Sequence, residues 1–387
     1  MRPAHPERPF SRKSWRLLAC LPLLWWGSVP RQDSAAVEAS DGIELLYVAN
    51  RMEGTISVIE VPSFEVIGKF DALPDVPADQ RPEGGLAYDL VAPNTGEVLY
   101  VARDEVRDVV AFSTATEELL WRLPVGGIAD HMALSHDGRY LFVSVISESH
   151  AVVIDTVDPA VVGKINTGIG PHSMHMSPDG KRVYNGCILC DQITIADAST
   201  FEVIRTIQFE EGVRPFAITA DEQTMFIQLS KLHGFVVLDL KTDQVVKTIH
   251  LPVPDGVDHL KTWPHTAHHG LALTPDGTRL CVAGTVGHYV GIVSVDGLDL
   301  LATIPIGSEP YWMTASLDSK YCYASARYDD SVSIISLSEE REVARLELGG
   351  YAFGMWTVRI PARQVGRYSK PSSGLRRSPP LISLPTR

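Results

Sequence analysis

The sequence lacks a surplus of basic residues: 34 Lys and Arg stand against 47 Asp and Glu, a net charge of -13 over 387 residues. A nucleic-acid partner requires a basic face, so this balance argues against that class of function. Long apolar runs are also lacking. The run Leu17–Trp26 is shorter than the roughly 20 residues that cross a bilayer. We therefore expect no nucleic-acid partner and no transmembrane span in the mature protein.

Familiar catalytic motifs are missing as well. The sequence has no Gly-x-Ser-x-Gly, no phosphate-binding glycine loop between a strand and a helix, and no His-Glu-x-x-His. Among its 5 cysteines there is one Cys-x-x-Cys, so a zinc site built from two such pairs is excluded. Chemistry in this chain must come from residues that are distant in sequence.

The two ends differ in composition from the rest of the chain. Arg12, Lys13 and Arg16 precede the apolar run, a pattern typical of an export signal, and we assign residues 1–39 to a signal and leader. Residues 361–387 are rich in Ser, Pro and Arg, which predicts a disordered basic tail. The expected location is periplasmic or secreted, with a compact acidic body over residues 43–360.

That body is a repeat. A turn of the type Ser-Pro-Asp-Gly, followed by an apolar strand, recurs at intervals of 42 residues with one longer interval of 55. The turns are anchored at Thr95, Asp137, Asp179, Asp221, Asp276 and Asp318. Each copy contains four short strands, which form one antiparallel sheet with two apolar faces. Such sheets bury their faces by stacking radially, which predicts a propeller.

The first copy, which begins near Tyr47, lacks its leading strand. The segment 353–360 lies 42 residues beyond the equivalent strand of the preceding copy and supplies the missing one. We therefore predict an all-β, seven-bladed β-propeller of four-stranded antiparallel blades. Its ring is closed by N- and C-terminal strands in one blade, which leaves no open sheet edge.

Leu46-Tyr47-Val48-Ala49-Asn50 and the Pro-Asp-Gly-Lys-Arg-Val-Tyr segment 178–184 resemble the Tyr-Val-Thr-Asn (YVTN) family of β-propeller repeats. The resemblance covers roughly residues 43–360. The wider group resembles the propellers of nitrous-oxide reductase and of quinoprotein amine dehydrogenases, lactonase-like hydrolases, and many surface proteins. The resemblance therefore implies the fold, and it leaves the function open.

The histidines gather on one face of the predicted ring. Ten of the 13 lie in the loops that lead into the innermost strands or in those between the second and third strands, and both loop types share a face. Two longer insertions, 71–85 and 251–264, enter the same face. Extra loop on a regular scaffold is where a rim or lid is usually built.

One position in the repeat register, seven residues before each anchor, is largely polar. It holds Tyr88, Asp130, His172, Arg214, His269, Tyr311 and Phe353. Two residues further along each strand the register is uniformly apolar, as expected for the core between blades. We therefore expect the mouth of the central channel at the polar position, with Tyr88, Asp130, Arg214, Tyr311 and Trp263 of the second insertion as ligand-binding residues.

Imidazoles from different blades can hold a copper, zinc or iron ion. The candidates are His131, His172 and His269, best placed by register, together with His265 and His268. An organic ligand at the same mouth, or no site at all, remains open. His175 stands where the sister blades have small residues, and it is either a structural hydrogen-bonding residue or a ligand.

Cys187 and Cys190 lie in a loop on the same face as His172. A disulfide that pins this loop fits an exported protein, while a redox pair and soft-metal ligation with His172 remain open. Cys281 and Cys322 are expected to be buried thiols.

The leading functional hypothesis is an exported propeller whose His-rich face binds a metal or small ligand and supports oxidoreductase-type chemistry. One alternative is a non-catalytic binding or scaffold protein of the cell envelope, with a protein partner there. The other is a lactonase-like hydrolase, for which Asp130, Glu83 and Glu309 are the convenient carboxylates.

Overall fold

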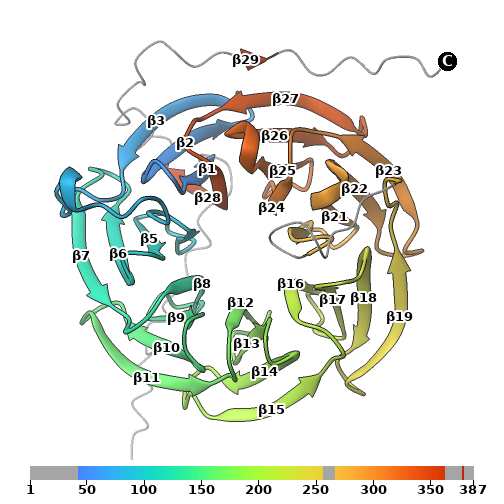
Figure 1. The fold of residues 1–387 in the computed structure, drawn as a ribbon, viewed down its shortest axis with the longest axis horizontal. Coiled ribbons are helices and arrows are strands. Elements are labelled where there is room, and N and C mark those ends of the chain that lie inside the picture. The colour runs from blue at the N-terminus through green and yellow to red at the C-terminus, as the bar shows by residue number, and fades with distance from the viewer. Residues whose placement is uncertain (1–41, 256–265, 362–376, 379–387) are drawn as a thin grey trace, which may run out of the picture. The chain divides into compact units, whose positions relative to one another are not determined.

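The computed structural model of this protein describes residues 42–255, 266–361 and 377–378. These residues form seven antiparallel sheets arranged as the blades of a ring (Figure 1), and the predicted seven-bladed propeller is confirmed. Regular helix is limited to three short 3-10 turns among them, η1 (Ala78–Gln80), η2 (Thr285–Gly287) and η3 (Arg327–Asp329). Across this part of the chain, no helix has the length and apolar character needed to cross a membrane.

Each blade contains four strands in chain order from the axis outward, and blade one begins with the last long strand. Blade one is β28 (Ala352–Pro361), β1 (Gly42–Asn50), β2 (Thr55–Val61) and β3 (Glu65–Asp71). Blade two is β4 (Asp89–Val91), β5 (Val98–Arg103), β6 (Asp108–Ser113) and β7 (Leu119–Pro124). Blade three is β8 (Ala129–Leu134), β9 (Tyr140–Val145), β10 (His150–Asp155) and β11 (Ala160–Asn166). Blade four is β12 (Pro171–Met176), β13 (Arg182–Cys187), β14 (Gln192–Asp197) and β15 (Val203–Gln208).

The remaining three blades repeat this plan. Blade five is β16 (Val213–Ile218), β17 (Thr224–Leu229), β18 (Gly234–Asp239) and β19 (Gln244–His250). Blade six is β20 (Leu271–Leu273), β21 (Arg279–Gly284), β22 (Tyr289–Ser294) and β23 (Leu300–Pro305). Blade seven is β24 (Pro310–Ala315), β25 (Tyr321–Ala326), β26 (Ser331–Ser336) and β27 (Arg341–Glu347). A fifth strand, β29 (Arg377–Ser378), pairs with β27, so two residues of the tail expected to be disordered are ordered as a strand.

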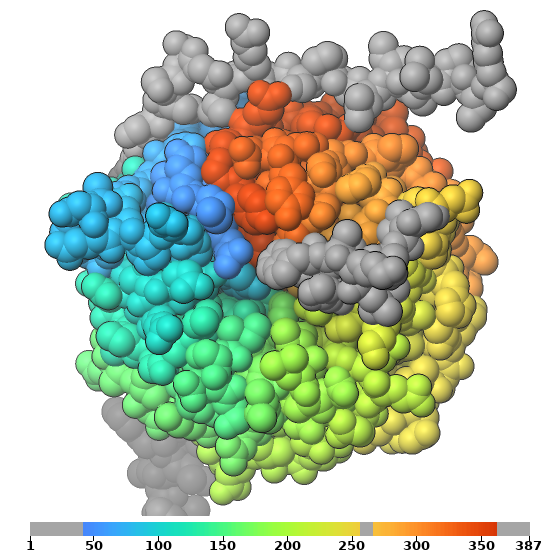
Figure 2. All heavy atoms as spheres, viewed as in Figure 1, coloured from blue at the N-terminus to red at the C-terminus, as the bar shows by residue number. Residues whose placement is uncertain are grey.

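The ring closes in blade one as predicted. β28 pairs antiparallel with β1 from Gly42 opposite Pro361 to Asn50 opposite Ala352. The first and last parts of the ring, blue and red in Figure 2, therefore lie side by side. This pairing makes β28 the innermost strand of blade one and completes that sheet with segments from both ends of the ring.

The recurrent turn is held by a repeated set of hydrogen bonds. In blade four, Ser177 Oγ donates to Asp179 Oδ1 at 2.7 Å, and the Lys181 amide donates to the same oxygen at 3.0 Å. These bonds lower the pKa of Asp179 to about 2. Gly180 follows with φ 72°, a conformation that glycine adopts without strain. The motif that revealed the repeat is therefore a structural one, which satisfies the backbone as the innermost strand reverses into the next.

Seven of the eight apolar clusters in the described residues each contain one residue of the apolar register position predicted from the sequence. These residues are Leu90, Met132, Met174, Phe216, Leu271, Met313 and Met355. Each cluster draws residues from more than one blade, since a blade with two apolar faces is buried only by its neighbours.

One prediction about the core is wrong. Cys281 and Cys322 are fully buried, as expected, but they are joined by a disulfide rather than present as thiols. Cys281 lies in β21 of blade six and Cys322 in β25 of blade seven. The disulfide therefore links two neighbouring blades through strands that the sequence could not show to be in contact.

Candidate metal centre

The residues at the polar register position come together at the start of the seven innermost strands. We call them, with Asp89, His131 and Trp312, the closed layer. All seven ring residues are buried, between 0 and 8% exposed: Tyr88, Asp130, His172, Arg214, His269, Tyr311 and Phe353. They contact one another across the axis as well as around it, since His172 of blade four bonds His269 of blade six. The channel is therefore closed at this level, where the sequence analysis expected a mouth.

Bulges at the start of the innermost strands explain why two successive residues of one strand can both belong to the closed layer. The pairing of β8 with β9 shifts register between Ala129 and Met132, and that of β12 with β13 shifts between Pro171 and Met174. A bulge places two residues opposite one and re-aims their side chains. Asp130 and His131 both reach the cluster described below for this reason.

Asp130, His131 and His172 form a compact cluster of metal-ligating side chains. One ligand atom from each lies within 4.8 Å of the others, and all three residues are buried. Asp130 Oδ1 lies 3.3 Å from His131 Nε2 and 3.6 Å from His172 Nδ1. Two ligand atoms that are each about 2.0–2.2 Å from one ion at a tetrahedral angle lie roughly 3.3–3.6 Å apart. The spacing fits a shared transition-metal ion.

The hydrogen bonds of His269 determine the tautomer of His172, that is, which of its two ring nitrogens carries the proton. His269 Nδ1 lies 3.2 Å from the Tyr311 carbonyl oxygen, which can only accept, so Nδ1 is the donor. In the neutral ring Nε2 is then an acceptor, and His172 Nε2, 3.3 Å away, donates to it. The remaining nitrogen of neutral His172, Nδ1, carries a lone pair that lies 3.6 Å from Asp130 Oδ1 and 3.5 Å from the Ser173 hydroxyl, which can donate to it.

The pKa shifts agree with neutral rings here. Burial, followed by the charges of His131, His269 and Arg214, lowers the pKa of His172 well below its ordinary value. Burial and the charge of Arg214 also lower the pKa of His269 well below its ordinary value. Burial raises the pKa of Asp130 to about 6. Near neutral pH, a lone pair and a carboxylate therefore face each other in a buried site, an arrangement that a cation between them would stabilise.

His131 has no ordinary hydrogen-bond partner among the described residues, although it is 2% exposed. Its Nδ1 lies 3.5 Å from Asp89 Oδ2 and its Nε2 3.3 Å from Asp130 Oδ1, and neither contact has hydrogen-bond geometry. The ring stacks on Trp312 with centroids 4.4 Å apart and planes at 21°. Burial opposes the charged form of His131, but the two carboxylates outweigh it and raise its pKa. The carboxylates therefore favour the protonated ring of His131, and an ion bound here would have to displace that proton.

The other predicted ligand-binding residues pack around this cluster. Tyr311 stacks on His269 with centroids 3.7 Å apart, and Phe353 lies between Tyr311 and Tyr88. Arg214 Nε donates to Ser230 Oγ at 2.9 Å. These side chains orient and enclose the imidazoles, and the structure shows none of them as a ligand atom of the cluster.

His268 lies apart from the cluster. Its ring contacts His233 and Tyr289, with centroids 5.7 and 6.1 Å away. Trp263 and His265 lie outside the described residues. Glu309 accepts hydrogen bonds from Arg327, and the metal-ligating group found in the described residues contains Asp130 as its one carboxylate. Glu309 is therefore not part of the group around Asp130, and the lactonase-like alternative stays a prediction.

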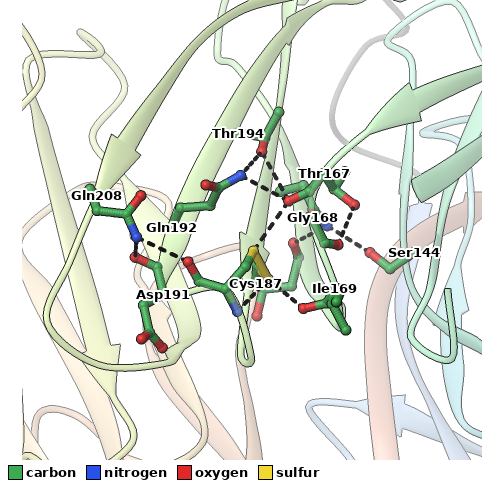
Figure 3. The surroundings of a disulfide bond; sticks show 12 residues. Ser144, Thr167, Gly168, Ile169, Cys187, Asp191, Gln192, Thr194 and Gln208 are labelled. Atoms are coloured by element: carbon green, nitrogen blue, oxygen red, sulfur yellow. Dashed lines mark hydrogen bonds between the residues drawn. A yellow bond between two sulfur atoms is a disulfide. The ribbon is translucent and has the colours of Figure 1, made fainter. Parts of the chain in front are cut away.

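A disulfide closes the loop between Cys187 and Cys190 (Figure 3). Cys187 lies opposite Pro171, the residue before His172. The loop is tied further by Gln192, whose side chain donates to the Thr167 carbonyl at 3.0 Å, and by Gln208, which donates to the carbonyls of Cys190 and Asp191. With both sulfurs in a disulfide, the thiolates needed for soft-metal ligation are not present.

The sequence analysis missed Asp89 and Trp312. Both occupy the register position six residues before the anchor, as His131 does, between the two positions that were compared. Comparing this intermediate position across blades would have found them. Arg51 and Arg327 were also missed; they lie over the rings of Tyr88 and Tyr311 at 5.2 and 4.5 Å from the centroids.

Comparison with known proteins supports the fold. No family model and no curated protein matches the chain, so its resemblance to the YVTN family stays a prediction. Among 1723 matching chains of solved structures is Kuenenia stuttgartiensis hydrazine synthase, with a TM-score of 0.47 and 20% identity over 65% of this chain and 96% of that one. Another is the dihydro-heme d1 dehydrogenase NirN in complex with DHE, with a TM-score of 0.56 and 15% identity over 79% of this chain. This chain spans 64% of the NirN chain, and the likeness shows a shared propeller fold.

Proposed function

We propose that this protein is an exported, oxidoreductase-type β-propeller that binds a copper, zinc or iron ion through Asp130, His131 and His172. The carrying observation is the hydrogen-bond chain from the Tyr311 carbonyl through His269 to His172, which leaves a lone pair on His172 Nδ1 facing the Asp130 carboxylate. His269 is then a positioning residue that fixes the tautomer of His172. A bound ion would supply Lewis acidity or, as copper or iron, electron transfer.

Three further observations support the proposal. Both ring nitrogens of buried His131 lie near carboxylates without a hydrogen bond, so an ion could take the place of the ring proton. Four of the 5 cysteines form disulfides, which persist in oxidising compartments and fit the predicted export signal. A structural neighbour of the same fold is named as a dehydrogenase, which makes redox chemistry a reasonable first assay.

The test is metal content and affinity in full-length protein purified without a His tag. Inductively coupled plasma mass spectrometry should find close to one equivalent of copper, zinc or iron in the native protein or after loading. Asp130→Asn and His172→Ala should each lose at least tenfold in affinity. His268→Ala is the matched control, because His268 is equally buried but lies outside the cluster. Protein that neither contains nor gains thermal stability from any of these ions would contradict the proposal.

A second candidate, a non-catalytic binding protein of the cell envelope, is favoured by the burial of the closed layer. An ion there would hold blades three and four together without meeting a substrate from the His-rich face. The two candidates differ in redox behaviour. A metal that changes oxidation state with added dyes supports the first, and a redox-silent metal whose removal lowers only the melting temperature supports the second.

A further inference from the structure

A cavity of about 640 Å³ occupies the central channel beneath the closed layer. It ends at Asp89, His131, Ser173 and Trp312 of the innermost strands. In the other direction it reaches the recurrent turns, where its lining includes exposed residues such as Asn94 and Pro178. The channel is therefore blind at the metal cluster and open to solvent on the face opposite the histidine-bearing loops. Its volume is typical of a small-molecule site.

The walls of this cavity are apolar and adaptable. Five of the chain's 8 methionines line it: Met132, Met174, Met176, Met313 and Met355. Methionine side chains are flexible and make favourable sulfur contacts with aromatic rings, so this wall suits a ligand with rings. Phe216 and Trp356 add aromatic surface of their own.

The charges around the cavity select against an anion. No Lys or Arg is among the residues that line it in the described part of the chain, and the carboxylate of Asp89 lies at its blind end. An anionic ligand would lose its hydration and meet no Lys or Arg along the wall, and the carboxylate of Asp89 would offset the attraction of His131 at the blind end. An uncharged ligand suffers neither penalty.

His175 is the polar residue of the cavity wall that departs from the repeat, although Ser135, Thr274, Thr314 and Thr357 also line the cavity. It stands where the neighbouring blades have Ala133 and Ala217, and its ring packs on Phe216 at 4.6 Å between centroids. Within the described residues its ring nitrogens make no hydrogen bond to protein. Burial lowers its pKa to about 4, so near neutral pH it offers one donor and one acceptor.

We propose that the channel binds an uncharged phenol: an aromatic molecule that enters at the recurrent-turn face, places its ring against the methionine wall and bonds its hydroxyl to His175. The inner end of such a molecule lies against Trp312 and His131. The inference deepens the proposed function, because it names the substrate class of the same site. Phenol binding requires no metal ion, so the phenol proposal and the metal proposal can fail separately.

The experiment follows tryptophan fluorescence, since Trp312 and Trp356 line the cavity. The full-length protein is titrated with 4,4′-dihydroxybiphenyl, with biphenyl and with biphenyl-4-carboxylate. We expect saturable binding of the diphenol, about tenfold weaker binding of biphenyl through loss of the hydrogen bond, and still weaker binding of the carboxylate. Carboxylate binding as tight as that of the diphenol would overturn the proposal.

Two variants locate the ligand. His175→Ala should weaken the diphenol about tenfold and leave biphenyl unchanged, whereas the control His268→Ala should change neither. Ala217→Trp fills the cavity beside His175 and should abolish binding of both, with circular dichroism reporting the fold. Unchanged diphenol affinity in both variants would refute the site. Repeating the titration in metal-free Asp130→Asn separates the phenol site from the metal site. Retained affinity for the diphenol supports the phenol site even where the metal proposal fails. Diphenol binding that requires the metal contradicts the phenol site, which uses no metal ligand.

Discussion

The two ends of the central channel differ in chemistry although the same seven strands build both. The closed layer holds imidazoles, two carboxylates and Arg214, with Arg51 and Arg327 stacked above its aromatic rings. A few residues further along each strand, the channel is lined by Met, Leu and Phe, without a cation among its described lining residues. Burial makes the polar end costly unless its groups are paired or bind an ion. The difference matches our proposals that the polar end binds an ion and that the apolar end binds a neutral ligand.

The largest predicted effect tests whether the closed layer is packed more tightly than the channel wall. Phe353 is 1% exposed and contacts Tyr88, Tyr311 and Arg51. Phe353→Ala should lower the free energy of unfolding by about 3–5 kcal/mol, because the vacated space is enclosed on all sides.

Met174→Ala is the matched change in the channel wall. Its side chain already borders an open cavity, so it has fewer contacts to lose, and we expect a cost of about 2 kcal/mol. Chemical denaturation of both variants gives the two values. Equal losses would mean that the two ends are packed alike.

Much of this comparison could be predicted from the sequence. The 42-residue spacing predicts seven blades, and the alignment of the turns identifies both the polar and the apolar register positions. The closing of blade one by β28 and β1 also follows, because a missing strand at one end matches a spare strand at the other. Repetition makes such inferences reliable, since each copy checks the others.

Contacts across the axis and between neighbouring blades could not be predicted. His172 meets His269, and Cys281 meets Cys322, because of how blades tilt and pack, and no repeat spacing encodes this. The burial of the residues at the polar register position could not be predicted either. The same Tyr, His and Arg residues could point outward to solvent or inward toward one another, and the sequence does not distinguish the two. The apolar channel was identified only as core, because the space left at the axis depends on all seven blades together.

A second prediction concerns His175, which faces the open channel, and uses its pKa. The unfolded state binds a proton near pH 6.5, whereas the folded state binds it only near pH 4, through burial and the nearby charge of His131. Between these values the unfolded state holds more protons, so stability is lost as the pH falls. The full contribution is about 3 kcal/mol, present above pH 6.5 and absent below pH 4.

His175→Gln should remove this dependence. The difference in unfolding free energy between the wild type and this variant should therefore change by about 3 kcal/mol between pH 7 and pH 4, as measured by urea denaturation at each pH. The exposed His136→Gln serves as the control for loss of one histidine. A difference that is constant with pH would show that water in the channel solvates the charged ring of His175.

The smallest predicted effect concerns the Cys187–Cys190 loop, which borders the closed layer. A disulfide that closes so short a loop constrains the unfolded chain little, so Cys187→Ala with Cys190→Ala should cost at most about 2 kcal/mol. Metal affinity should change less than twofold, because the proposed ligands are Asp130, His131 and His172 and the loop keeps its Gln192 and Gln208 bonds. Mass spectrometry and thermal denaturation measure the two quantities on the same preparation. A loss of metal as large as that of His172→Ala would instead make the cysteines ligands, and the ion would then lie on the outer side of His172 rather than between it and Asp130.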